Sequence, residues 1–100
     1  MRRIPALPLL AVTLLAGCAV PEARLRAGLV NAGLAEPMAA CMAERMVDRL
    51  SLIQLRRIGD LPYAREERTV AGVLHRVRSL RDPEIWTVTS AAAAACAVRG

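Results

Sequence analysis

The most reactive side chains in this sequence are three cysteines, Cys18, Cys41 and Cys96, and a single histidine, His75. A thiol can be acylated, oxidised to a disulfide or, as a thiolate, bound to a metal ion. Zinc sites use three or four protein ligands, which one histidine and widely separated cysteines do not supply. A redox-active dithiol is usually a Cys-x-x-Cys turn, and no two cysteines here have that spacing. The spacing therefore favours neither a metal centre nor a thiol-disulfide catalyst, and we expect His75 to be an exposed surface residue.

The hydroxyl and carboxyl groups do not form a catalytic pattern either. Ser51, Ser79 and Ser90 have no histidine placed nearby and no strand-turn-helix context that would make one of them a nucleophile. Glu66 and Glu67 are adjacent, so on a helix of 3.6 residues per turn they point about 100° apart. No glycine-rich stretch resembles a phosphate-binding loop. We therefore expect no catalytic activity, no cofactor and no metal.

The first 17 residues have the features of an export signal. Arg2 and Arg3 precede the uncharged stretch IPALPLLAVTLLAG, which ends in small residues. A positive start, a short apolar stretch and small residues at its end are typical of a secretory signal peptide. A transmembrane helix needs about 20 apolar residues, and the run before Pro21 and Glu22 is shorter. An uncleaved membrane anchor is therefore the less favoured interpretation.

The four residues Leu15-Ala16-Gly17-Cys18 directly follow that apolar stretch. They resemble the lipobox of bacterial lipoprotein precursors, and the resemblance covers residues 1–18. It implies that the Cys18 thiol forms a thioether to diacylglycerol, that residues 1–17 are removed, and that Cys18 becomes the N-terminus. In that family an aspartate after the cysteine usually retains the protein in the inner membrane. This sequence has Ala19 there, which implies an outer membrane location facing the periplasm.

A second interpretation places the cleavage after Ala19, with Gly17 as the other small residue of the cleavage site. It would release a soluble periplasmic protein. In both interpretations Cys18 is no longer a free thiol in the mature domain, so two cysteines remain. Because disulfides form and persist in the compartments that receive exported proteins, we expect a bond between Cys41 and Cys96. In the chain-entropy model, closing so long a loop stabilises a fold by about 4 kcal/mol.

Hydrophobic periodicity predicts an all-α fold, a small bundle of four or five short helices tied by one disulfide. Apolar residues recur at helical spacing over residues 36–50 and 63–80. The sequence SLIQ, residues 51–54, has the form of a capping box and predicts a short helix over 52–58. Asp82 and Pro83 are suited to begin a last helix. Residues 18–35 are interpreted as a tether with at most a short helix, and residues 36–100 as the helical domain.

The two cysteines of the expected disulfide occupy different kinds of helix face. Cys41 falls among the charged residues of its predicted helix, whereas Cys96 shares an apolar face with Ile85, Val88 and Ala92. A cysteine in the core would lie on the apolar side, so Cys41 is expected to bond to an element approaching from its charged side.

The remaining signal is the formal charge of +5, which is concentrated in residues 51–81. Arg65, Arg68 and Arg76 are predicted to share a helix face, which would be solvated or would bind anionic lipid or an acidic envelope protein. Export removes chromosomal DNA as a partner, and one Tyr and one Trp give little to stack on bases, so nucleic acid is not expected.

The stretch CMAERMVDRLSLIQLRRIGDL is similar to small helical exported proteins of proteobacteria that have no assigned activity, and this likeness implies no functional residue. The sequence thus predicts an envelope lipoprotein with a structural or protein-interaction role. The alternative is a soluble binding module that uses the arginine face.

Overall fold

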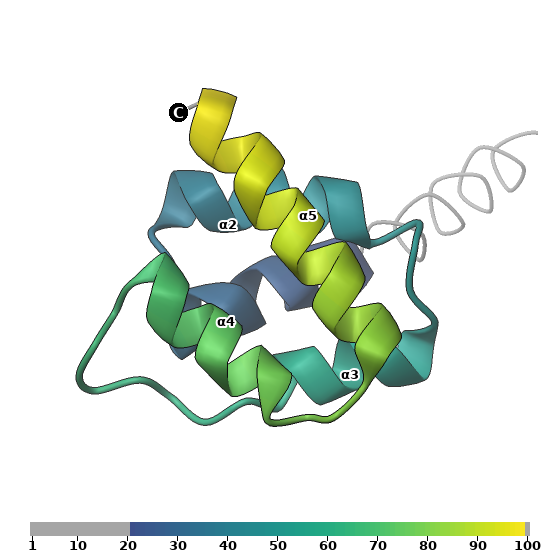
Figure 1. Ribbon diagram of the computed structural model, residues 1–100, viewed down its shortest axis with the longest axis horizontal. Coiled ribbons are helices and arrows are strands. Elements are labelled where there is room, and N and C mark those ends of the chain that lie inside the picture. The colour runs from purple at the N-terminus through teal and green to yellow at the C-terminus, as the bar shows by residue number, and fades with distance from the viewer. Residues whose placement is uncertain (1–20, 100) are drawn as a thin grey trace, which may run out of the picture.

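The computed structural model describes residues 21–99 of the 100-residue chain. A helix occupies residues 21–32, and it is followed by α2 (Glu36–Met46), α3 (Leu52–Gly59), α4 (Val70–Arg78) and α5 (Pro83–Arg99) (Figure 1). Over these residues the chain forms no strand. The predicted all-α bundle is therefore confirmed, whereas the expected export signal and Cys18 lie outside the described residues.

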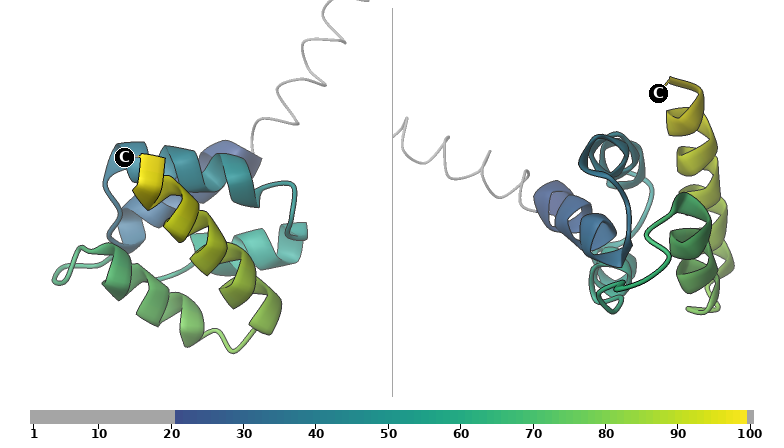
Figure 2. Two further views of the ribbon diagram at one scale, coloured as in Figure 1. Left: turned by 45° about the horizontal axis from the view of Figure 1, so that its top comes forward. Right: turned by 90° about the vertical axis from the view of Figure 1, so that its left-hand side faces the viewer.

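The helices are arranged in two layers. A side view shows α4 and α5 in one layer and helix 21–32, α2 and α3 in the other (Figure 2, right). The long helix α5 crosses the bundle and packs on both α2 and α4. Each layer therefore presents one apolar face to the other.

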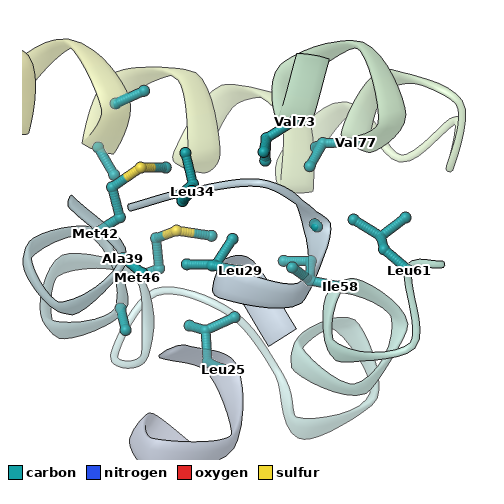
Figure 3. Close-up of a cluster of buried hydrophobic side chains, with 14 of the residues drawn as sticks. Leu25, Leu29, Leu34, Ala39, Met42, Met46, Ile58, Leu61, Val73 and Val77 are labelled. Carbon is teal, nitrogen blue, oxygen red and sulfur yellow. The ribbon is translucent and has the colours of Figure 1, made fainter. Parts of the chain in front are cut away.

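The core between the layers is built from aliphatic and methionine side chains, because the sequence contains no phenylalanine. Leu29 lies near Met42 and Met46 of α2 and Ile58 of α3, with Val73 of α4 above them (Figure 3). All five side chains are fully buried. Methionine adapts its shape to irregular gaps, which suits a core assembled from short helices at varied angles.

Two of the predicted helix starts are confirmed in atomic detail. The Ser51 hydroxyl accepts a hydrogen bond from the Gln54 backbone N–H at 3.2 Å, and the Gln54 side-chain oxygen accepts one from the Ser51 N–H at 2.9 Å. This capping box separates α3 from α2, which ends at Met46 instead of running to residue 50. At α5, Oδ1 of Asp82 accepts hydrogen bonds from the backbone N–H groups of Glu84 and Ile85 at 3.0 and 3.1 Å.

Within residues 18–35, which the sequence predicts to be a tether with at most a short helix, the structure has a helix over residues 21–32 that packs into the core. Leu25, Leu29 and Ala32 recur on one face of helix 21–32 and are buried in the core, as is Leu34. Gly33 has a φ of +127° directly after the helix. Glycine adopts that backbone conformation at little cost, so here it ends a helix that belongs to the folded domain.

The predicted helix over residues 63–80 is shorter than expected and begins at Val70. The Thr69 hydroxyl accepts a hydrogen bond from the Gly72 backbone N–H at 3.0 Å, which fixes the helix start there. Before it, Glu67 has a φ of +51°, and the N–H of Ala64 donates to the carbonyl of Asn31 at 2.8 Å. Residues 61–69 therefore form an irregular connection that is bonded to the end of helix 21–32 through the Ala64 N–H.

Candidate functional site

The predicted disulfide is present and joins α2 to α5. Cys41 and Cys96 are bonded, with their Cα atoms 6.0 Å apart. Cys96 is buried on the inner face of α5, and Cys41 is half-buried on α2. Cys41 is thus bonded to the helix that packs on α2, and its side chain lies against the edge of the core.

The C-terminal end of helix 21–32 is closed by a set of backbone and side-chain hydrogen bonds. The N–H of Leu34 donates to the carbonyl of Leu29, and the N–H of Gly33 donates to the carbonyl of Val30, both at 3.0 Å. Together with the left-handed glycine, these two bonds form a Schellman motif. Leu29 and Leu34 are both buried in the core, which supplies the hydrophobic contact that usually accompanies the motif.

Two arginines complete this helix end. Nη2 of Arg68 donates to the Val30 carbonyl at 2.6 Å, and Nη1 of Arg76 donates to the Ala32 carbonyl at 3.0 Å. With the Ala64 N–H on the Asn31 carbonyl, all four terminal carbonyls of the helix have a donor. A helix end leaves such carbonyls without an intrahelical partner, so cationic donors are well placed there. We call Arg68, Arg76 and these carbonyls the arginine clamp.

The predicted arginine face is not a free surface, because Arg68 and Arg76 bond to backbone carbonyls. Arg68 also donates to the carbonyl of Ala64 at 2.7 Å, and its guanidinium lies 5.0 Å from the centroid of the Tyr63 ring. Arg65 lies on the connection between α3 and α4 and is exposed. The three arginines therefore do not line one helix face, and two of them are engaged in holding the fold together.

The remaining side chains that could take part in chemistry are not grouped into a site within residues 21–99. His75 is exposed in the last turn of α4. Among residues 21–99, no three His, Cys, Asp or Glu side chains are grouped so that they could hold a metal ion. The Thr89 hydroxyl on α5 is buried and has no hydrogen-bond partner within residues 21–99. Its neighbours on that helix face are Ile85 and Ala93, so its surroundings are apolar.

A groove lies between helix 21–32 and α3. It encloses about 350 Å³ and is lined mainly by carbon atoms. Its walls come from the first two turns of helix 21–32 and from one face of α3, with these lining residues: Pro21, Arg24, Leu25, Ala27, Leu52, Leu55, Arg56, Gly59 and Asp60. Beyond the groove, a Cβ added to Gly28 would come within 2.7 Å of the Gly59 Cα. Glycine at position 28 thus allows the two helices to approach closely.

None of the helices formed within residues 21–99 is long and apolar enough to cross a membrane. Comparisons with protein-family models, with curated proteins and with solved structures found no match to this chain.

Proposed function

We propose that this chain is a small bacterial envelope lipoprotein, anchored through acylated Cys18, in which the helical domain has a structural or protein-interaction role. The observation that carries the proposal is the motif Leu15-Ala16-Gly17-Cys18 directly after a charged start and a short apolar stretch. A cysteine at that position is the residue that a thioether-linked lipid requires. A lipid on Cys18 would hold the helical domain at a membrane surface.

The Cys41–Cys96 bond supports the export part of the proposal. Disulfides persist in oxidising compartments and are rare in the reducing cytosol. A domain of this size gains little stability from its core alone, so a covalent link between α2 and α5 is a substantial addition. The link lies far from the lipobox in sequence, so it supports export independently of Cys18.

The alternative of a soluble module that binds anionic partners through Arg65, Arg68 and Arg76 has less support. Arg68 and Arg76 donate their guanidinium hydrogens to backbone carbonyls of residues 30, 32 and 64. A ligand that used them would compete with the cap of helix 21–32. We therefore propose the anchored form without an arginine-based binding face.

The deciding experiment is the intact mass of the protein purified from membranes of its own host, before and after reduction. We expect the mass of residues 18–100 plus a diacylglyceryl group and any acyl chain on the new amino terminus, rising by about 2 Da when the disulfide takes up two hydrogen atoms. Two control variants separate the features. Cys18→Ala should lose the lipid, whereas Cys41→Ala combined with Cys96→Ala should keep the lipid and lose the 2 Da increase. A lipid-free chain beginning at Val20 would contradict the proposal.

A further inference from the structure

We propose that the first turn of α3 rests on the phospholipid bilayer, with Leu52 and Ile53 inserted among the headgroups beside the anchor. This inference rests on the proposed lipid anchor, and it adds the orientation in which the domain is held. It assigns a membrane-contacting face to a chain in which no helix of residues 21–99 is long and apolar enough to span a bilayer.

The face is defined by two large apolar side chains that the fold leaves in solvent. Leu52 is 65% exposed and Ile53 is 72% exposed. They directly follow the capping residue Ser51, whereas Leu55 and Ile58 of the same helix turn into the core. Single exposed apolar residues are common on protein surfaces. Here two adjacent ones project from one helix turn, and Leu52 also lines the apolar groove.

The segment between Cys18 and Pro21 is short enough to hold this face close to the membrane. Pro21 lines the same groove as Leu52, and Cys18 precedes Pro21 by three residues. Three residues span at most about 11 Å when fully extended. An acyl group on Cys18 in the bilayer therefore confines the groove, and with it the start of α3, to the immediate vicinity of the headgroups.

The charges around the groove are compatible with an anionic lipid surface. Arg24 and Arg56 both line it and are both exposed, and within residues 21–99 neither forms an ion pair. Asp60 is the one carboxylate among the lining residues. Basic side chains close to an anionic leaflet are attracted to it, while apolar side chains at the interface add buried area. The two effects act on the same side of the domain.

The molecule also offers a matched site that should not touch the membrane. Val98 is 88% exposed in the last turn of α5. In Figure 1 the first turn of α3 lies at the right, on the side where helix 21–32 begins, whereas the end of α5 lies at the upper left. A probe at Val98 therefore reports on an exposed apolar position that the anchor does not bring to the bilayer.

The test uses the lipidated protein, purified from membranes and reconstituted into vesicles of phosphatidylethanolamine and phosphatidylglycerol. Trp86→Phe removes the native tryptophan, and Ile53→Trp or Val98→Trp then places a single fluorophore on each face. We expect brominated phospholipids to quench the tryptophan at position 53 at least twofold, with emission shifted to shorter wavelength. The tryptophan at position 98 should emit as in water and be quenched by less than a tenth.

The outcomes separate this inference from the proposed function. If both tryptophans are unquenched while the protein remains with the vesicles after an alkaline wash, the anchor stands and the membrane-facing orientation is overturned. Equal quenching at both positions also overturns it, because the domain would then have no preferred face. Release of the protein by the wash, together with a lipid-free mass, would instead contradict the proposed anchor. Circular dichroism of each variant before reconstitution verifies that the helical content is retained.

Discussion

The two junctions that hold helices together in this bundle use different chemistry. The junction of α2 with α5 is covalent, through Cys41 and Cys96. The junction of helix 21–32 with residues 64–76 consists of hydrogen bonds, in which two guanidinium groups and one backbone N–H reach three carbonyls at the helix end. The first junction depends on an oxidising environment, and the second depends on side-chain geometry that exists only in the folded chain.

This difference determines where each junction acts. A disulfide restricts the unfolded chain as well as the folded one, so its removal changes the free energy of unfolding of the whole domain. The arginine clamp does not exist in the unfolded chain. Its loss leaves the Val30 and Ala32 carbonyls at one helix end without their side-chain donors. Mutations that break the disulfide should therefore cause a larger loss in the free energy of unfolding, and one spread over the whole domain. Mutations in the arginine clamp should cause a smaller loss confined to one helix end.

The largest effect should come from breaking the covalent junction. Cys41→Ala combined with Cys96→Ala, or reduction of the wild-type protein, is expected to lower the free energy of unfolding by about 4 kcal/mol in the chain-entropy model. Urea titration followed by circular dichroism measures it. Reduction should have no further effect on the double variant. An unchanged urea midpoint in the reduced wild type would show that the hydrogen-bonded junction and the core suffice alone.

The next effect tests how closely helix 21–32 must pack on α3. Gly28→Ala places a Cβ within 2.7 Å of the backbone of Gly59, so the helices must separate, at a cost of about 2 kcal/mol. Gly59→Ala is the matched control, because a Cβ there meets nothing within 4 Å. It should be neutral or slightly stabilising. If thermal unfolding shows no greater loss for Gly28→Ala than for Gly59→Ala, the close approach of the two helices does not require glycine at position 28.

A smaller loss is expected from opening the arginine clamp. Arg76→Met removes the donor to the Ala32 carbonyl while keeping an unbranched side chain, and should cost about 1 to 2 kcal/mol. Arg65→Met is the control, since Arg65 is exposed and donates no hydrogen bond within the described residues. Hydrogen exchange should show faster exchange at Gly33 and Leu34 in Arg76→Met alone. Equal stability of the two variants would mean that the clamp contributes nothing beyond the Schellman motif.

The smallest effect concerns the turn between α4 and α5, outside both junctions. The backbone N–H of Ile85 and, next, the side chain of Gln54 lower the pKa of Asp82 below its ordinary value of 3.8. The folded-state pKa is lower than the unfolded one, so the stabilisation is complete above pH 3.8 and is lost as the pH falls through the folded-state value.

Asp82→Asn keeps an acceptor at the helix start but cannot titrate. Its urea midpoint should therefore decline less steeply than that of the wild type between pH 4 and pH 2.5. Parallel curves for the two proteins would contradict the assignment of this acid sensitivity to Asp82.

Features that depend on short stretches of sequence could be predicted. The capping box at Ser51 and Gln54 and the start of α5 at Asp82 involve residues two or three apart, and each was found where its pattern predicted it. The disulfide could be predicted because the cysteine count and the export signal left one pairing. The bundle class followed from helical periodicity in the longer segments.

The arginine clamp could not be predicted because it joins residues 38 and 44 positions apart, and nothing local indicates which carbonyls Arg68 and Arg76 will meet. The end of helix 21–32 did carry a local signal. Gly33 followed by the apolar Leu34 is the sequence form of a Schellman motif, and it would have indicated a helix in place of a tether. The start of α4 carried a local signal too, because the apolar residues at helical spacing begin only at Val70, and Thr69 directly before them is a preferred N-cap residue.

The disulfide also determines how the domain would respond to tension. A force applied between residue 21 and residue 99 passes along the chain to Cys41, crosses the sulfur–sulfur bond to Cys96, and leaves at the end of α5. Once the hydrogen bonds of the arginine clamp have broken, the helices α3 and α4, which lie inside the covalent loop, carry none of that load. Only residues 21–40 and the last turn of α5 can be drawn out, to a length on the order of 70 Å for the first of these segments. Helix 21–32 and its arginine clamp would therefore yield first, while the rest of the bundle stayed closed.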